Sequence, residues 1–301
     1  MENFVLFVRM ARPLFLVGGV LLYALGAGVA HYLGTNINWG IYLLGQAWVT
    51  VLQLGTQFLN EYYNAPEDVD NKNRTPFSGG SGALGPGKLP RRIAMVGGLT
   101  CLTVVASLTV LMLAENVLSP LVLLIMVLIF LGAFFYSTPP VALERSGYGE
   151  LTASVLVAFL VPAFAFSLQS GDLHRLIAMA TFPLVMLHMA MLLSFEFPDY
   201  ANDLKHQKRT LLVRLGWRSG ITIHNIFILG GFLLLLLAAS FNLPLFVLLP
   251  ALLPIPLAVL QVWQLARIAN GGKPNWNALT INGIAVFAST AYLITFSFWT
   301  H

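Results

Sequence analysis

The sequence predicts an all-α, polytopic membrane protein, with nine transmembrane helices around a central cavity that opens to a polar cap on the cytoplasmic side. Three observations support this fold class. Charged residues make up only 9% of the 301 residues, the mean hydropathy is +0.79, and apolar stretches recur along the whole chain. Each stretch reaches the ~20 residues that a helix needs to cross a membrane, whereas soluble domains carry about 25% charged residues. We expect residues 1–301 to form one transmembrane domain.

The apolar windows are bounded by Gly, Pro, Asn or charged residues. The first follows Arg9 and Arg12 and is too long for the apolar region of a signal peptide, so we interpret it as an uncleaved span. The second ends where a polar, acidic stretch begins, and the sixth ends at another. In chain order the predicted spans are 13–33, 39–59, 92–114, 118–137, 151–168, 175–194, 220–239, 243–265 and 279–299.

The positive charges give this arrangement an orientation. With the N-terminus in the cytoplasm, all of the sixteen Lys and Arg residues except Arg175 fall on the cytoplasmic side. This is the bias that the positive-inside rule predicts. Of the twelve Asp and Glu residues, only Glu115 and Asp172 fall on the other side. We therefore expect an integral, multi-pass protein of the plasma (inner) membrane if the source is prokaryotic, with its C-terminus outside and its chemistry at the cytoplasmic ends of the helices.

An amide stripe runs along one side of the second span at i, i+4 spacing: Gln53, Gln57, Asn60 and Asn64. Amides in a lipid-spanning helix are unfavourable unless they face a cavity or a partner helix. Pro66 is expected to end or bend this helix. Asp68 and Asp70 are therefore predicted to lie in a loop near the helix mouth.

A second acidic stretch ends the sixth span. Asp199 and Asp203 are one helical turn apart and share a face, with Glu196 about a turn before them. Cations follow at Lys205, Lys208, Arg209 and Arg214. Carboxylates and amides suit Mg²⁺, which usually takes one or two carboxylates together with substrate phosphates, and Lys and Arg pair with phosphate. The alternative is that these are ordinary polar loops, but their occurrence twice on one side favours a site for a diphosphate with a hydrocarbon tail.

At these residues the chain resembles the UbiA superfamily of intramembrane prenyltransferases. That family has nine transmembrane helices and two Asp-rich motifs, of the forms NDxxDxxxD and DxxxD, after helices 2 and 6. Asn60, Glu61, Asn64 and Asp68 lie at the four positions of the first motif, and Asp199 and Asp203 match the second. The stretches TPFSGGSGAL (75–84), FFYSTPPVALERSGYGEL (134–151) and KRTLLVRLG (208–216) look most like the 1,4-dihydroxy-2-naphthoate polyprenyltransferases of menaquinone synthesis.

The resemblance implies Mg²⁺-dependent transfer of a polyprenyl group from a polyprenyl diphosphate to an aromatic acceptor similar to dihydroxynaphthoate, within the lipid bilayer. It implies one Mg²⁺ at Asn60, Asn64 and Asp68 and another at Asp199 and Asp203. The chain departs from the family at Asn64, where Asp is usual, and Asp70 is a candidate for the missing charge. The candidates for binding the diphosphate are Lys72, Arg74, Arg145, Lys208, Arg209 and Tyr136.

Two alternatives remain open at this point. One is a prenyltransferase of the same type with another acceptor, such as hydroxybenzoate or another lipid-quinone precursor. The other is a transporter or lipid-binding membrane protein with an acidic ion pocket, although transporters tend to place ionisable residues near the bilayer midplane. Binding of nucleic acid is not expected, because the cations that raise the pI to about 9.3 are accounted for by the membrane orientation.

Overall fold

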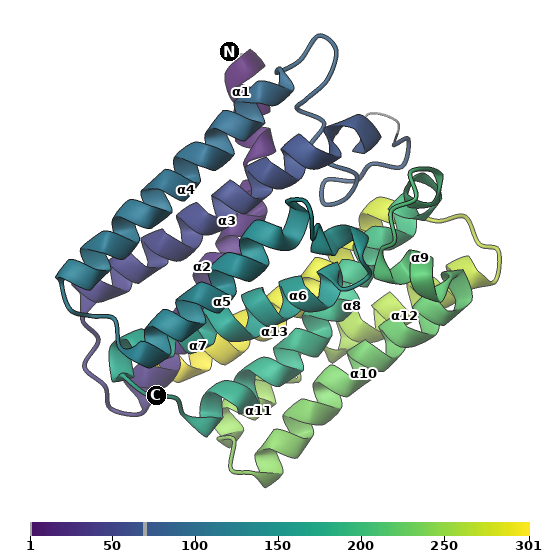
Figure 1. The fold of residues 1–301 in the computed structure, drawn as a ribbon. Coiled ribbons are helices and arrows are strands. Elements are labelled where there is room, and N and C mark those ends of the chain that lie inside the picture. The colour runs from purple at the N-terminus through teal and green to yellow at the C-terminus, as the bar shows by residue number, and fades with distance from the viewer. Residues whose placement is uncertain (1, 69–70) are drawn as a thin grey trace.

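The computed structural model describes residues 2–68 and 71–301, and the long elements in this part of the chain are all helices (Figure 1). In chain order they are α1 (Glu2–Met10), α2 (Pro13–Tyr32), α3 (Trp39–Asp68), α4 (Arg91–Ala114), α5 (Pro120–Ser137), the 3₁₀ turn η1 (Leu143–Arg145), α6 (Gly149–Val155), the π-helical turn η2 (Leu156–Leu160), α7 (Val161–Ser170), α8 (Arg175–Lys205), α9 (Leu211–Leu215), α10 (Trp217–Ser240), α11 (Leu245–Ala251), α12 (Ile255–Ala269) and α13 (Trp276–Thr300).

Eight helical segments of the described chain are long and apolar enough to cross a membrane. The predicted second span corresponds to α3, which has 30 residues but carries the amide stripe, so it is less apolar than the others. These eight segments and α3 match the predicted spans in order. The fold class predicted from the sequence is therefore confirmed, and the protein is an integral, multi-pass membrane protein.

Several helix boundaries differ from the predicted spans. The span predicted at 243–265 is broken into α11 and α12 by a turn at Leu252–Pro254, in a segment that contains Pro250, Pro254 and Pro256. Proline removes a backbone donor and clashes with the preceding turn, which explains the break. The span predicted at 151–168 contains the π-helical turn η2, which ends two residues before Pro162. Pro162 lacks the N–H that would bond to the backbone oxygen of Ala158 in this turn, so the regular helix ladder is disturbed there.

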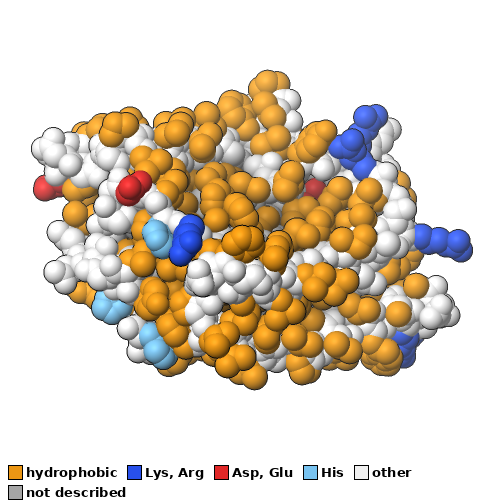
Figure 2. All heavy atoms as spheres, turned by 90° about the horizontal axis from the view of Figure 1, so that it is seen from below, with side chains coloured by type: hydrophobic (Ala, Val, Ile, Leu, Met, Phe, Trp, Pro, Cys, Tyr) orange, Lys and Arg blue, Asp and Glu red, His pale blue; other side chains and the backbone are white. Residues whose placement is uncertain are grey.

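The outer surface of the bundle is mainly hydrophobic. Figure 2 shows one face on which hydrophobic side chains dominate the middle, while Lys and Arg side chains gather toward one end. Large apolar side chains are exposed over the molecule as a whole, among them Leu14, Leu43, Val110, Leu229 and Leu253. Such a surface is stable when lipid covers it. The N- and C-termini lie at opposite ends of the bundle (Figure 1).

The bundle core is closed by tight helix crossings. Trp299 of α13 donates a hydrogen bond from Nε1 to the backbone oxygen of Ala24 on α2, at 2.9 Å. On the other side of α2, Gly26 lies directly against α7. A Cβ atom at Gly26 would lie 2.0 Å from the backbone oxygen of Pro162 and 2.9 Å from the Cβ of Ala165. Small residues at such crossings let helix backbones approach closely in membranes.

Replacing Gly26 by Ala is therefore expected to destabilise the protein by about 2 kcal/mol, because the added methyl meets backbone that cannot rotate away. Thermal unfolding of the purified protein in detergent measures the effect. Gly18 on the same helix is the matched control, because a Cβ there meets nothing within 4 Å. Equal melting temperatures for the two Gly→Ala variants would contradict this account of the crossing.

Candidate active site

A cavity of about 530 Å³ lies among α2, α3, α5, α6, α8 and α13, within the ~300–1,000 Å³ usual for small-molecule sites. Its mouth, at the polar ends of the helices, is lined by charged and amide side chains and by the loop 77–80. Its inner part, toward the middle of the helices, is lined by apolar side chains that include Leu52, Ile129, Val161, Ile284 and Phe287. The cavity therefore suits an elongated molecule with a polar head and an apolar tail.

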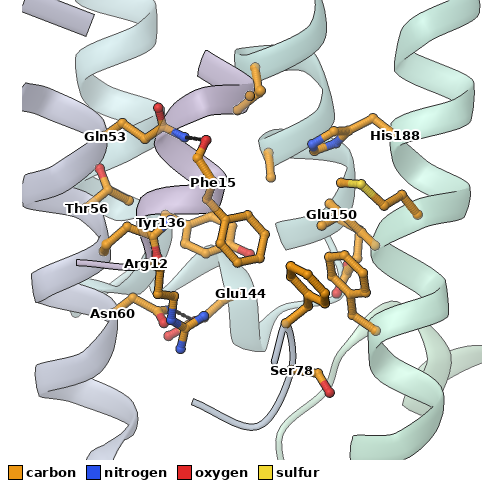
Figure 3. Close-up of a pocket in the computed structure, with 18 of the residues that line it drawn as sticks. Arg12, Phe15, Gln53, Thr56, Asn60, Ser78, Tyr136, Glu144, Glu150 and His188 are labelled. Carbon is orange, nitrogen blue, oxygen red and sulfur yellow. Dashed lines mark hydrogen bonds between the residues drawn. The ribbon is translucent and has the colours of Figure 1, made fainter. Parts of the chain in front are cut away.

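The amide stripe of α3 faces this cavity, as the sequence indicated. Gln53, Gln57, Asn60, Asn64 and also Asp68 line the cavity from one side of the helix. Figure 3 shows Gln53, Thr56 and Asn60 on one wall and Glu150 and His188 on the opposite wall, with Ser78 at the mouth. The residues at this i, i+4 spacing therefore form one wall of the cavity.

The prediction that Asp68 lies in a loop beyond Pro66 is wrong. Helix α3 continues through Pro66 to Asp68. Proline lacks the N–H that would bond the backbone oxygen of Tyr62, four residues earlier, but Arg91 donates to that oxygen from Nε at 2.6 Å. The lost helix bond is thus replaced by a side chain from α4, and Asp68 extends the stripe by one more turn. Asp70 lies outside the described residues.

The second acidic motif lies on the end of α8, which runs beyond the predicted span to Lys205. Asp199 and Asp203 both line the cavity, one turn apart. The Asp199 carboxylate accepts hydrogen bonds from Asn71 Nδ2 at 2.7 Å and from the backbone N–H of Gly79. The loop after α3 therefore spans the mouth and joins the two acidic helix ends.

Asn60 and Asn64 are held by a carboxylate that the sequence did not suggest. Glu144 on η1 is 4% exposed, and its Oε2 accepts from Asn60 Nδ2 at 2.6 Å and from Asn64 Nδ2 at 2.9 Å. The Asn64 Oδ1 accepts from Arg145 Nη2 at 3.3 Å. Gly149 allows this turn to pack on the start of α6, because a Cβ there would lie 2.6 Å from the Glu144 Cα. Glu144 thus brings a negative charge to the place where Asn64 stands instead of Asp.

One of the predicted cations, Lys208, lines the cavity mouth. The pKa of its ammonium group is raised above that of an exposed lysine. Burial alone would lower this pKa, but nearby carboxylates more than offset the burial effect. In order of their influence, these are the carboxylates of Glu144, Asp203, Asp68 and Asp199. Lys208 is therefore a fixed positive charge among acids, at the place where a polar head group would enter.

The other predicted diphosphate ligands occupy different positions. Tyr136 lines the cavity. Arg145 lies at the rim, paired with Glu67. Arg74 donates to the backbone oxygens of Gly79, at 2.7 Å, and of Asp68, so it shapes the loop at the mouth. Lys72 and Arg209 are exposed and do not line the cavity.

A shallow basic pocket lies on the same polar end of the bundle, separate from the cavity. It has a volume of about 560 Å³ and joins the loop after α3 to the loop between α12 and α13. Its cations are Lys72, Arg74, Arg267 and Lys273. Two of the cations predicted to bind the diphosphate therefore line this pocket.

Arg12 and Glu61 form an ion pair beside the cavity that the sequence did not predict, although it placed Glu61 in the first acidic motif. Arg12 lines the cavity and pairs with Glu61, its Nε donating to Oε1 at 3.0 Å. Glu61 also accepts from the backbone N–H of Ser81 at 2.8 Å and from Ser81 Oγ at 2.5 Å. The pair thus fastens the glycine-rich loop to α2 and α3. The nearness of Arg12 to the first span was the only sequence signal for it.

Replacing Glu61 by Gln is expected to lower the free energy of unfolding by about 3 kcal/mol, because the Arg12 guanidinium loses its buried counter-charge. The Glu61 side chain is 3% exposed and that of Arg12 is 18% exposed. Glu67→Gln is the matched control, since its partner Arg145 is 34% exposed and such pairs contribute at most about 1 kcal/mol. Thermal unfolding in detergent distinguishes them, and equal losses would contradict the assigned role of Glu61.

The donor set at the mouth fits Mg²⁺ bound together with a phosphate ligand. In the described part of the chain, no three Asp, Glu, His or Cys side chains converge on one point. Asp68 instead lines the mouth from the end of α3, and Asp199 and Asp203 line it from the end of α8. The three carboxylates are close enough to interact electrostatically with one another. Mg²⁺ needs only one or two carboxylates when phosphate oxygens and water complete its shell.

The chain matches the UbiA prenyltransferase family over residues 20–290. It therefore belongs to this family of membrane prenyltransferases. No curated protein sequence matches the chain significantly.

Solved structures share the fold at low identity. A UbiA homolog from Archaeoglobus fulgidus bound to GPP and Mg²⁺ has a TM-score of 0.67 and 16% identity, covering 96% of this chain and 99% of that one. A UbiA homolog from Archaeoglobus fulgidus bound to DMAPP and Mg²⁺ has a TM-score of 0.57 and 18% identity, covering 96% of this chain and 98% of that one. A digeranylgeranylglyceryl phosphate synthase has a TM-score of 0.63 and 15% identity, covering 100% and 98%.

Proposed function

We propose that the protein transfers a polyprenyl group from a polyprenyl diphosphate to an aromatic acceptor similar to dihydroxynaphthoate, in the biosynthesis of a lipid quinone. The observation that carries this proposal is the cavity itself, whose acidic and basic mouth continues into an apolar interior. The head of a prenyl diphosphate matches the mouth, and its hydrocarbon tail matches the interior. A transporter is less well supported, because the acids lie at one end of the helices and not near their middle.

In this proposal Asp68, Asp199 and Asp203 hold Mg²⁺, and the side-chain oxygen of Asn60 (Oδ1) is available as a neutral ligand. That oxygen makes no hydrogen bond within the described chain. Mg²⁺ bound there would act as a Lewis acid that neutralises the diphosphate leaving group. Asn64, held between Glu144 and Arg145, keeps the stripe in place.

The chain's own side chains supply the remaining chemistry. Lys208 binds the diphosphate as a point charge, and Tyr136 borders the head group in the cavity. The apolar wall orients the tail and excludes water from the allylic carbon as its bond to oxygen breaks. Charges fixed in such a water-poor site stabilise a developing anion more strongly than they would in water.

A direct assay tests this function. The purified protein is incubated with Mg²⁺, geranylgeranyl diphosphate and a panel of acceptors that includes 1,4-dihydroxy-2-naphthoate and 4-hydroxybenzoate. We expect a prenylated product and stoichiometric diphosphate, both lost on chelation of the metal and restored by added Mg²⁺. If no acceptor gives a product and no diphosphate is released, the proposed function is wrong.

A further inference from the structure

Two buried glutamates in the cavity wall have no role in the site described so far. Glu150 lies in the first turn of α6 and Glu196 lies on α8, and they are 6% and 9% exposed, respectively. Both line the cavity. The backbone N–H of Leu212 donates to Glu196 Oε2 at 2.8 Å. Glu150 Oε2 and Glu196 Oε1 are buried and receive no donor from any described residue.

The two carboxyl groups line the same cavity from α6 and α8, which pack against each other. Carboxylate oxygens are acceptors, so the unpartnered oxygens can take a hydrogen bond from a donor that enters the cavity. The geometry therefore describes a pair of buried carboxylates that offers the cavity two acceptor oxygens without a donor from any described residue.

The pair lies between the mouth and the deeper part of the cavity (Figure 3). Glu196 precedes Asp199 by three residues on α8, about 4.5 Å deeper along the helix axis. In Figure 3, Glu150 lies between Ser78 at the mouth and the deeper His188. With the diphosphate at the mouth and the tail in the apolar interior, the allylic carbon lies beside the pair.

The surroundings determine which acceptor group the pair can bind. Within the described chain, neither glutamate forms an ion pair with Lys or Arg, and Glu144 adds a further buried carboxylate nearby. A hydroxyl group of the acceptor can donate to the unpartnered oxygens, whereas an acceptor carboxylate would be repelled by them and has to point away from the pair.

We propose that the Glu150–Glu196 pair binds a hydroxyl group of the acceptor and takes up its proton as the prenyl group is transferred. This inference rests on the proposed function and deepens it. The O–H electrons move into the ring, a ring carbon bonds to the allylic carbon, and the carbon–oxygen electrons leave with diphosphate. The alkylated ring then moves its proton from carbon to oxygen, and the pair releases its proton to water. If that ring carbon carries a carboxylate, CO₂ leaves instead and the oxygen takes its proton back from the pair.

The test uses Glu150→Gln, Glu196→Gln and the double variant, with geranyl diphosphate, Mg²⁺ and naphthols of graded hydroxyl acidity. We expect each single variant to lower kcat by on the order of 10²-fold or more, the usual contribution of a general base. The double variant should lose little more than the worse single one, because the two residues act as a unit. Binding of geranyl diphosphate should stay within about twofold of wild type, since the pair does not contact the head group in this account.

The loss should shrink for acceptors whose hydroxyl is already ionised at the assay pH, and Glu150→Asp should restore part of the rate. Glu115→Gln, an exposed substitution at the opposite end of the bundle, is the matched control. A variant that still binds geranyl diphosphate is folded. If one of the two single variants does not bind it, the activity of the other single variant tests the inference. The inference is overturned if the folded variants react at the wild-type rate, or if their losses are equal for all acceptors. In either case the proposed function still stands as long as the wild-type protein transfers the prenyl group. A wild-type protein that transfers to no acceptor removes both.

Discussion

Replacing Asp199 by Asn is expected to lower kcat for prenyl transfer by on the order of 10³-fold, because a preorganised charge at the leaving group is lost in a water-poor site. The substitution keeps the shape of the side chain, and its oxygen can still accept from Asn71, so the loop at the mouth should remain in place. Activity at saturating geranylgeranyl diphosphate, measured over a range of Mg²⁺ concentrations, checks the effect. We expect the variant to need more Mg²⁺ for half-maximal rate.

Asp172→Asn is the control for this prediction, since Asp172 is exposed in the loop before α8 at the other end of the bundle. Its activity should equal that of the wild type. Full activity and an unchanged Mg²⁺ requirement in Asp199→Asn would remove Asp199 from the proposed metal set.

Replacing Lys208 by Met is expected to reduce kcat/KM for geranylgeranyl diphosphate by on the order of 10²-fold. The ammonium lies at the mouth among four carboxylates, which raise its pKa and keep it charged. Without it, those carboxylates repel the incoming diphosphate. Added Mg²⁺ should compensate only in part, because it cannot restore a charge fixed in position.

The adjacent Arg209 provides the control, since Arg209→Met removes a cation of the same loop that is exposed and does not line the cavity. Steady-state kinetics should separate the two variants clearly. Equal losses would mean that the loop attracts diphosphate by its net charge and that Lys208 has no specific place in the site.

Helix periodicity predicted the parts of the site that lie on single helices. The stripe from Gln53 to Asn64 and the pair Asp199 and Asp203 face the cavity because residues four apart share a helix side. The spans themselves followed from the length of the apolar windows. Their ends were less predictable where prolines interrupt the chain, as at the turn between α11 and α12.

Contacts between distant segments could not be predicted in this way. Arg91 on α4 compensates for Pro66 on α3, and the Arg12–Glu61–Ser81 connection joins three separate segments. Glu144 and Glu150 were within a stretch that already resembled the family, but their burial depends on the packing of η1 and α6 against α3 and α8. Side-chain direction in the loops, which separates Lys208 from Arg209, is likewise set by tertiary contacts.

The central claim is that the acidic and basic mouth of the cavity binds the diphosphate of a prenyl substrate. An experimental structure with Mg²⁺ and a non-hydrolysable geranyl thiodiphosphate tests it most directly. The account predicts the diphosphate between the ends of α3 and α8, next to Asp68, Asp199 and Lys208, with the geranyl tail directed toward Phe287. A diphosphate in the basic pocket of Lys72, Arg267 and Lys273, with the cavity mouth free of metal and phosphate, would contradict it.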